Sequence, residues 1–342
     1  MAKKASILLI YTGGTIGMIH DPATGRLKPF NFRRLLDEVP ELKKLDVRID
    51  TRAFEKPIDS SNMHPDIWIR LARLIEKNYN KYDGFVVLHG SDTMAFTASA
   101  LSFMLENLAK PVILTGSQLP IGTIRTDGKE NLITAIEIAA AMRQGKPRVP
   151  EVCIYFEYRL FRGNRTSKFN AEHFRAFHSP NYPLLAEAGV HLKYNTAAIR
   201  PMAAGPLKVH AKLDTSVVVL KLFPGISREA VKSILGIKNL KAVVLETYGS
   251  GNATTEKWFL GALRKAVKKG IVILNVSQCA AGKVEQGRYE TSESLRKAGV
   301  TGGSDLTTEA AITKLMYLLA GAKNRDRVAG LLGRDLCGEL TL

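Results

Sequence analysis

Cysteine is scarce in this chain of 342 residues, which contains only Cys153, Cys279 and Cys337. These three are odd in number and far apart, so the sequence predicts neither a disulfide framework nor a cysteine metal site. Long hydrophobic runs are also missing, and none approaches the roughly 18 apolar residues that a membrane-spanning helix needs. The apolar run at 7–10 is too short for a signal peptide. We therefore expect a cytoplasmic protein with no membrane partner.

Long basic blocks are missing too, although the net charge is +17, from 49 lysines and arginines against 32 acidic residues. Such an excess can attract nucleic acid, membranes or small anions. The basic residues are dispersed, as in the pairs at 43–44 and 268–269, and no basic helix carries interleaved aromatic residues. We therefore expect a basic, solvated surface and no nucleic-acid partner.

The first informative stretch is ILLIYTGGTIGM at 7–18. Its apolar start is typical of a buried strand, and its two glycines let the backbone turn and approach a ligand closely. Thr15 then lies at the carboxyl end of a strand, where open α/β sheets bind ligands. The glycine spacing fits neither a dinucleotide fingerprint nor a P-loop. A turn in which Thr15 bonds only its own backbone stays an alternative at this point.

The second informative stretch is FVVLHGSDTM at 85–94. Its apolar residues predict another buried strand, and a helical pattern follows at 93–105. Ser91 and Asp92 therefore lie where a helix begins, and they could cap that helix or act on a ligand. His89 precedes the turn and is expected to be structural.

Strand, polar turn and helix alternate along most of the chain, which predicts an α/β fold with a doubly wound, mostly parallel sheet. We expect a larger N-terminal domain at 1–195 with the catalytic hydroxyls, a linker at 196–214 and a smaller C-terminal α/β domain at 215–342. Further strands are predicted at 45–54, 111–114, 152–156, 216–223, 242–245 and 271–276, a long loop around 162–168, and helices at 65–75, 131–142, 228–235, 257–269 and 308–319.

Hydroxyl side chains, a carboxylate and an ammonium gather at the strand ends of the predicted N-terminal domain. A threonine hydroxyl is a poor nucleophile and needs a base or a proton relay, which Lys168 could supply. A solvated loop lysine is the simpler interpretation of Lys168 on spacing alone. The set suggests acyl transfer, with backbone N–H groups holding the oxyanion. No metal-ligand spacing occurs, so no metal site is expected. The residues are Thr15, Ser61, Ser91, Asp92, Gln118 and Lys168.

Several motifs resemble those of the bacterial-type L-asparaginases, and the cytoplasmic type I subgroup in particular. The resemblance spans nearly the whole chain, and two separate threonine/serine motifs at the right interval make it specific. The motifs are TGGTIGM at 12–18, DSSNM at 59–63, HGSDTMAFTASALSFMLENL at 89–108, TGSQLP at 115–120, RGNRTSK at 162–168, YGSGNA at 248–253 and TTEAAITKL at 307–315.

The resemblance implies hydrolysis of L-asparagine to L-aspartate and ammonia without a cofactor. It implies that Thr15 is the nucleophile that forms an acyl-enzyme with the substrate side chain. It also implies that Ser91, Asp92 and Lys168 form a second set, which moves protons and activates water. One extra methylene discriminates by only about 1–3 kcal/mol, so a weaker activity on glutamine is also expected.

The same resemblance assigns the substrate pocket and the assembly. Members form homodimers or homotetramers with sites at the subunit interface, so the implied partner is a second copy of the chain. Asp59, Ser60 and Ser61 would lie near the α-amino and α-carboxylate groups of L-asparagine. Gln118 would line the pocket, and Asn252 would reach the site of a neighbouring subunit.

The chain departs from the family pattern at three places. Many members have threonine where this chain has Ser91, and many carry a lid tyrosine that is absent between residues 12 and 34. Arg26 or Leu27 stands near the place of that tyrosine. Some type I members bind a second asparagine through an arginine before the YGxGN motif, where this chain has Glu246. A carboxylate cannot pair with the carboxylate of such an effector, which argues against allostery here.

Two other functions fit some of these features. A tRNA-linked amidotransferase subunit shares the motifs and would suit the positive charge, but such subunits carry an extra N-terminal domain. The first predicted strand begins at about residue 6, so no such domain is expected. A catalytically inactive binding protein is the other alternative, and the joint presence of the four implied catalytic residues argues against it.

Overall fold

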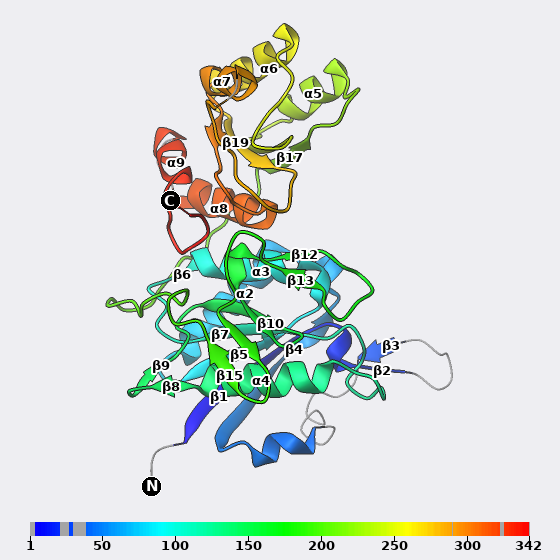
Figure 1. Ribbon diagram of the computed structural model, residues 1–342, viewed down its shortest axis with the longest axis vertical. Helices are drawn as coiled ribbons and strands as arrows, with labels where there is room; N and C mark the ends of the chain where they lie inside the picture. The colour runs from blue at the N-terminus through cyan, green and yellow to red at the C-terminus, as the bar shows by residue number, and fades with distance from the viewer. Residues whose placement is uncertain (1–3, 21–26, 30–38, 289, 322–324, 342) are drawn as a thin grey trace. The chain divides into compact units, whose positions relative to one another are not determined.

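The computed structural model describes residues 4–20, 27–29, 39–288, 290–321 and 325–341. The chain divides into two compact units, Met1–Ala211 and Lys212–Leu342 (Figure 1). Each unit has its own sheet and hydrophobic core, and each is described by itself below. The boundaries drawn from the sequence, with a linker at 196–214, stay a prediction.

The N-terminal unit is organised around an eight-stranded mixed sheet in the order β15-β14-β11-β10-β7-β5-β1-β4. The five strands from β10 to β4 are parallel, while β11, β14 and β15 extend the sheet beyond β10 through antiparallel pairs. The predicted mostly parallel sheet is therefore confirmed. The strands are β1 (Ala5–Gly13), β4 (Val47–Ile58), β5 (Gly84–Leu88), β7 (Val112–Thr115), β10 (Val152–Phe156), β11 (Arg159–Arg162), β14 (Ala186–Ala188) and β15 (Leu192–Tyr194).

The order of these strands reverses at β1. The chain passes from β1 to β4 on one side, then crosses back to β5 on the other side, and continues outward to β7 and β10. The connections around β1 lead to opposite sides of the sheet, so the loops that follow the carboxyl ends of β1 and its neighbour diverge. Such a switch point is where open α/β sheets bind ligands, and Thr15 lies directly beyond it.

Helices cover both faces of this sheet (Figure 1). Helices α2 (Pro65–Asn78) and α3 (Met94–Met104) lie on one face, and α4 (Gly128–Ala140) lies on the other. Alternate residues of β1, such as Ile7 and Leu9, share a buried cluster with apolar residues of α4. Strand side chains alternate between faces, so a strand covered on both sides is apolar at consecutive positions, as residues 7–11 of β1 are.

The predicted long loop around 162–168 is wrong. Strand β11 turns back directly on β10, and a short 3-10 helix at Gly163–Arg165 leads into β12 (Ser167–Lys168), which pairs with β13 (Phe177–His178). The β10–β11 turn has Glu157 and Tyr158 at φ 44° and 63°. Positive φ at both turn residues normally selects glycine or asparagine, so this hairpin has no turn signal in its sequence.

Short elements complete the unit. The predicted helix at 131–142 begins and ends earlier, as α4, because Met142 belongs to a hairpin. The small hairpins and bridges pair β2 (Met18–His20) with β3 (Leu27–Pro29), β6 (Leu105–Glu106) with β16 (Lys208–Val209), and β8 (Met142–Arg143) with β9 (Lys146–Pro147). Further 3-10 turns are Thr15–Gly17, Pro40–Lys44, Ser60–Asn62 and Ser91–Thr93.

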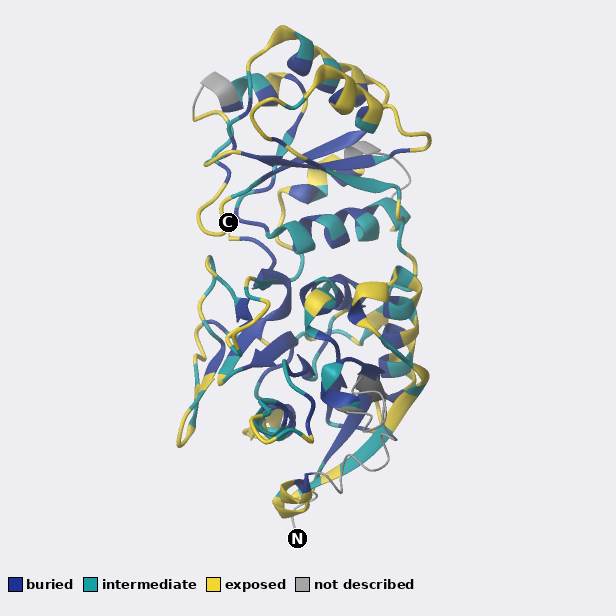
Figure 2. Cartoon of the chain, turned by 90° about the vertical axis from the view of Figure 1, so that its right-hand side faces the viewer, coloured by how far each residue is buried: buried dark blue, intermediate teal, exposed yellow. Residues whose placement is uncertain are grey.

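The C-terminal unit has a four-stranded parallel sheet in the order β17-β18-β19-β20. Alternate strand residues belong to two separate clusters: Val243 and Leu245 pack with α5, α6 and α7, whereas Val244 packs with α8 and α9. Buried strand segments in both units are dark blue in Figure 2. This is the predicted smaller α/β unit. Its elements are β17 (Val217–Lys221), α5 (Arg228–Leu235), β18 (Ala242–Thr247), α6 (Lys257–Lys268), β19 (Val272–Ser277), α7 (Glu290–Lys297), β20 (Thr301–Gly302), α8 (Thr308–Gly321) and α9 (Arg325–Leu332).

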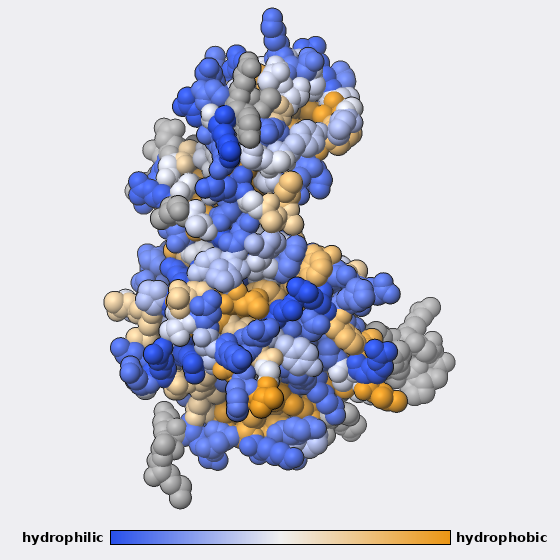
Figure 3. All heavy atoms as spheres, in the orientation of Figure 1, coloured by the Kyte–Doolittle hydropathy of each residue, from blue (hydrophilic) through white to orange (hydrophobic). Residues whose placement is uncertain are grey.

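On the face drawn in Figure 3, hydrophobic residues form separate spots among hydrophilic ones. In the described part of the chain, no helix combines the length and the apolar character needed to cross a membrane. The same described residues contain no group of three or more histidine, cysteine or acidic side chains arranged to hold a metal ion. All three cysteines are free thiols, and Cys153 is buried.

Candidate active site

Four polar turns lie at the carboxyl edge of the parallel strands. Residues 14–15 follow β1, 59–61 follow β4, 89–92 follow β5 and 116–118 follow β7. These strands are neighbours in the sheet, so turns that are far apart in the sequence lie next to each other. Three of these turns follow an apolar run directly, whereas the turn at 59–61 follows the mixed polar and apolar strand β4, which extends past the predicted strand at 45–54.

Two glycines bring the turns into backbone contact. A methyl group placed on Gly14, whose φ is 91°, would lie only 2.5 Å from the Gly90 nitrogen. A methyl group on Gly90 would lie 2.5 Å from the Ser60 hydroxyl oxygen. Only glycine therefore fits at these positions, and Thr15 and Ser91, the next residues along the chain, lie on touching turns.

Ser91 is the centre of a polar cluster. Lys168 Nζ donates to Ser91 Oγ at 2.8 Å and to Asp92 Oδ1 at 2.6 Å. Ser91 Oγ in turn donates to Gln118 Oε1 at 3.2 Å. The Lys168 side chain is 15% exposed and that of Asp92 is 62% exposed, so the pair is open to solvent on its acidic side. The structure thus brings Lys168 to the carboxyl edge of the sheet, on the short strand β12.

The loop that carries Gln118 is held by two residues that the sequence did not identify. The Asp127 carboxylate accepts the backbone N–H of Gln118 at 3.0 Å and that of Leu119 at 3.2 Å. Asn131 donates to the Gly116 carbonyl at 3.0 Å and to Asp127 at 3.2 Å. Burial raises the pKa of Asp127, against the lowering effect of these hydrogen bonds. Asp127 precedes α4, so from sequence it is indistinguishable from an ordinary helix cap.

His89 is fully buried beneath the second turn, in agreement with its expected structural role. Its Nδ1 lies 2.7 Å from the Gly90 carbonyl oxygen, and its Nε2 lies 2.8 Å from Thr97 Oγ1. Trp68 Nε1 donates to the same Thr97 oxygen at 2.9 Å, so the Thr97 hydrogen points to His89 Nε2. Burial lowers the pKa of His89 to about 4, and a neutral ring with its proton on Nδ1 satisfies every partner.

The Asp59–Ser61 turn has an exposed carboxylate and a buried anchor. Asp59 accepts the Ser61 backbone N–H at 3.0 Å and the Ser61 hydroxyl at 2.9 Å, and these two bonds lower the pKa of Asp59. Ser60 is 3% exposed, and its carbonyl accepts the Thr93 hydroxyl at 2.7 Å. Ser60 therefore ties this turn to the Ser91 turn, while Asp59 keeps an ionised group at the surface.

Two further residues singled out from the sequence lie in the C-terminal unit. Asn252 forms an antiparallel bridge with Tyr248, which shapes the YGSGN turn. Glu246, just before the YGSGN turn, accepts the Thr308 hydroxyl at 2.6 Å and lies 3.6 Å from Lys221 Nζ. Its carboxylate is therefore already paired within the unit. Residues 21–26 and 30–38, which include Arg26, lie outside the described residues, so no counterpart of the lid tyrosine is assigned.

Family models and relatives match nearly the whole chain. The model described as "Asparaginase, N-terminal" matches residues 6–200, and "Glutaminase/Asparaginase C-terminal domain" matches residues 216–332. The chain is 44% identical to L-asparaginase 1 of Escherichia coli K12, over 99% of both chains.

Two other matches bear on the function. The structure of L-asparaginase I from Vibrio cholerae superposes with a TM-score of 0.91 at 40% identity, covering 99% of this chain and 100% of that one. A glutamyl-tRNA(Gln) amidotransferase subunit from Pyrococcus abyssi is 32% identical, over 98% of this chain and 76% of its own length.

Proposed function

The chain belongs to the asparaginase family, and from this premise we propose how its own residues convert L-asparagine and water to L-aspartate and ammonia. It is an amidohydrolase that acts on the side-chain amide of L-asparagine. The observation that carries the mechanism is the contact between the Gly14 and Gly90 turns, beside the cluster of Ser91, Asp92 and Lys168.

Thr15 is the nucleophile of the first step. Its hydroxyl oxygen attacks the side-chain carbonyl carbon of asparagine, the bond from that carbon to the amide nitrogen breaks, and an ester to Thr15 remains. The hydroxyl proton ends on the nitrogen, which leaves as ammonia. The half-buried position of Thr15 beyond the switch point supports this role, as do backbone N–H groups of the two glycine-led turns that could hold the oxyanion.

Ser91 relays protons in both steps, with Lys168 bound to its hydroxyl and Asp92 bound to Lys168. In the first step Ser91 takes the Thr15 proton and passes its own to the leaving nitrogen. In the second step water attacks the ester, and Ser91 returns a proton to the Thr15 oxygen as L-aspartate leaves. Lys168 donates to Ser91 Oγ in the resting site, so the ammonium stabilises negative charge on that oxygen during transfer.

The remaining groups bind the amino-acid end of the substrate. The exposed carboxylates of Asp59 and Asp92 suit the α-ammonium group, and a lowered pKa keeps Asp59 ionised. Ser61 presents a hydroxyl beside Asp59, while Ser60 fixes the turn. Gln118 lies within hydrogen-bond distance of Ser91 and lines the same pocket.

The assembly and the location are also proposals. We expect a homodimer or homotetramer in which Asn252 of one subunit completes the site of another, which light scattering together with an Asn252→Ala variant would test. We expect a cytoplasmic enzyme, since three free thiols suit a reducing compartment. The paired carboxylate of Glu246 supports the prediction that no second asparagine binds at that position.

Ammonia release from asparagine and from glutamine, measured side by side, tests the reaction. A Thr15→Ala variant is expected to lose activity by at least about 10⁴-fold, whereas Thr15→Ser keeps a hydroxyl and should retain part of it. Rapid quenching with mass spectrometry should find the acyl group on a peptide that contains Thr15. Wild-type turnover by Thr15→Ala would show that another group is the nucleophile.

A tRNA-linked amidotransferase subunit is the alternative function, supported by the 32% identity to such a subunit against 44% to the asparaginase. A gel-shift titration with tRNA at several salt concentrations separates the two. Tight, steeply salt-dependent binding would favour the alternative, because phosphate contacts weaken as salt rises.

A further inference from the structure

A cationic pocket lies at the opposite edge of the N-terminal sheet from the candidate active site. It has a volume of about 380 Å³ and is formed by the β8–β9 hairpin, by Pro150 just before β10, and by the segment 196–202. Arg143, Lys146, Arg148 and Arg200 line it, and no acidic residue does. The remaining wall is largely apolar, with residues such as Ile199 and Met202.

These four positive charges are not neutralised by the described part of the protein. None of them has a carboxylate partner within 4.0 Å among the described residues. The nearby Glu151 carboxylate is already in a buried pair with Arg162 at 2.7 Å, and it also accepts the Arg200 backbone N–H at 2.8 Å. Glu151 therefore fixes the backbone of Arg200 while its charge is taken up by Arg162.

The hairpin adds an unfavourable feature that an anion would relieve. Arg143 and Lys146 are directly opposite each other on β8 and β9, across a tight turn in which Gln144 and Gly145 have φ of 52° and 74°. Like charges opposite each other on antiparallel strands destabilise the pair. Two more arginines line the pocket beside this hairpin. A bound anion would reduce the repulsion among these positive charges.

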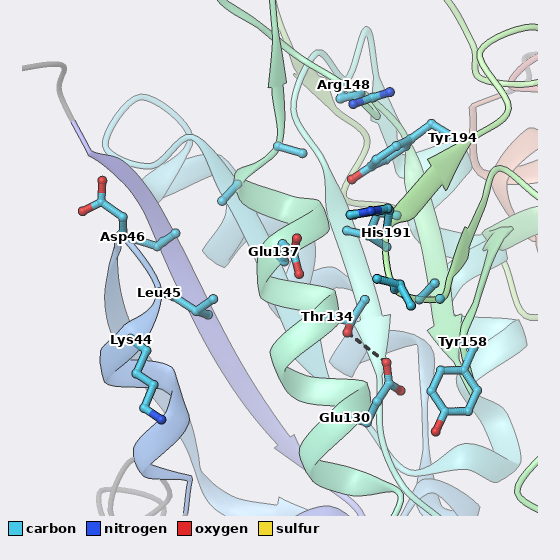
Figure 4. A pocket seen from close by; sticks show the side chains of 17 residues that line it. Lys44, Leu45, Asp46, Glu130, Thr134, Glu137, Arg148, Tyr158, His191 and Tyr194 are labelled. Atoms are coloured by element: carbon cyan, nitrogen blue, oxygen red, sulfur yellow. Dashed lines mark hydrogen bonds between the residues drawn. The ribbon is translucent and has the colours of Figure 1, made fainter.

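Arg148 has a fixed orientation. Its guanidinium carbon lies 3.8 Å from the centroid of the Tyr194 ring, and Figure 4 shows the two groups side by side. Stacking of this kind holds the planar fork of donors in one direction, which suits two oxygen atoms of one phosphate group.

Arg148 also borders the larger cavity drawn in Figure 4, of about 1070 Å³. Asp46, Glu130 and Glu137 line that cavity together with Lys44, so its charges are mixed. The purely cationic character is therefore confined to the smaller pocket beside it.

We propose that the smaller pocket binds a small molecule with two or more adjacent phosphate groups and an apolar part, the chemistry of a nucleoside diphosphate. Four cations match the charge of such a group, and the volume lies within the range of small-molecule sites. The apolar wall would take the base, and the net charge of +17 would raise the rate of encounter. The site is separate from the asparagine chemistry.

Isothermal titration calorimetry of the full chain with ADP, pyrophosphate and adenosine tests this site. We expect ADP to bind one to one and more tightly than pyrophosphate, and adenosine not to bind measurably. An Arg143→Gln/Arg200→Gln variant should weaken ADP binding by about tenfold or more, because each hydrogen bond from a charged donor to a phosphate contributes substantially to the binding free energy. Asparaginase activity without ADP should be unchanged.

The matched control is Arg228→Gln/Arg264→Gln, which removes the same charge from exposed positions on α5 and α6 of the other unit. ADP binding that survives in this control and fails in the pocket variant supports the proposal. Equal weakening in both variants would assign the binding to diffuse positive charge and overturn the proposal. It would also be overturned by the absence of ADP and pyrophosphate binding, or by adenosine binding as tightly as ADP.

Discussion

Two lysine–carboxylate pairs, one in each unit of the chain, have the same length and opposite surroundings. Lys168 Nζ lies 2.6 Å from Asp92 Oδ1, and Lys314 Nζ lies 2.6 Å from Glu339 Oε1. The side chains of the first pair are 15% and 62% exposed, whereas both of the second pair are 0% exposed. The distance alone therefore does not reveal what such a pair does.

The partners of each lysine explain the difference. Lys314 also donates to the carbonyls of Leu332 and Arg334, at 2.9 and 2.6 Å, and Glu339 accepts backbone N–H groups of Leu336 and Cys337. Those partners are backbone groups, and the pair holds the end of the chain against α8. Lys168 instead shares its charge with a hydroxyl, which can exchange its proton, and with a carboxylate open to solvent. The exchangeable partner distinguishes a site for chemistry from a structural anchor.

The largest expected effect follows from removing Lys168 from the pair that is open to solvent on its acidic side. Lys168→Met should lower kcat for asparagine by about 10²–10⁴-fold, because Ser91 loses the group that stabilises its oxygen during proton transfer. Folding stability should change by less than about 1 kcal/mol, because the Asp92 carboxylate that loses its partner is 62% exposed and stays solvated. Ammonia release and urea unfolding of the same preparation check both halves. A stability loss of several kcal/mol with normal kcat would make Lys168 a structural residue.

The buried pair should show the reverse. Lys314→Met is expected to destabilise the C-terminal unit by about 3–5 kcal/mol, because it leaves the Glu339 carboxylate buried without its partner. A Lys314→Met/Glu339→Leu variant removes both charges and should recover most of that loss. Urea unfolding monitored by hydrogen exchange on α8 measures it. If the single variant is as stable as the double one, the pair does not anchor the chain end.

The sequence predicted a role for Lys168 but not for Lys314. Lys168 was found through its motif, although its hydrogen-bond partner Ser91 is 77 residues away and its short strand was predicted as a loop. Lys314 lies in the middle of a helical pattern, where a lysine normally lies on the solvated face, so nothing local indicated its burial. Pairing of this kind depends on how segments that are distant in the sequence pack together. The hydrophobic periodicity of a single segment carries no information about that packing.

The same limit applies to the rest of the molecule. Apolar runs followed by polar turns predicted the parallel strands and the edge where Thr15 and Ser91 lie, since burial and turning are local properties. The β10–β11 hairpin was missed because its turn residues lack a glycine or asparagine signal. Asp127 was missed because its carboxylate accepts a backbone hydrogen bond from a loop that precedes it in the chain. In the sequence, such a residue cannot be distinguished from an ordinary helix cap.

Acid should affect the two units in different pH ranges. Burial lowers the pKa of His89 from 6.5 to about 4. As the pH falls, this histidine is therefore protonated in the unfolded chain at a higher pH than in the folded protein. The stability that the neutral ring contributes is complete above pH 6.5 and is lost as the pH falls towards 4, by at most about 3 kcal/mol. Urea unfolding of the N-terminal unit between these pH values measures the loss, and His89→Gln should reduce it.

Glu339 should respond only at lower pH. Burial alone would raise the pKa of Glu339, but the Lys314 charge and hydrogen bonds from Lys314 and the Cys337 N–H outweigh it, and the pKa is lowered from 4.5. Its contribution is therefore present above about pH 4.5 and lost below that value. Loss of the C-terminal unit before the N-terminal one between pH 6.5 and 4.5 would contradict this order.

The smallest expected effect concerns the hydroxyl that Lys168 holds. Ser91→Thr keeps the oxygen and adds a methyl group, and a β-branched side chain has fewer χ1 rotamers. The hydroxyl would then spend more time near Lys168 Nζ, now 2.8 Å away, so kcat should rise by about twofold to fivefold, less than about 1 kcal/mol. Ser91→Ala is the control, and it should lose at least about 10²-fold in kcat. Equal kcat for the serine, threonine and alanine enzymes would mean that no proton passes through this position. Lys168 would then resemble Lys314 in all but its exposure to water.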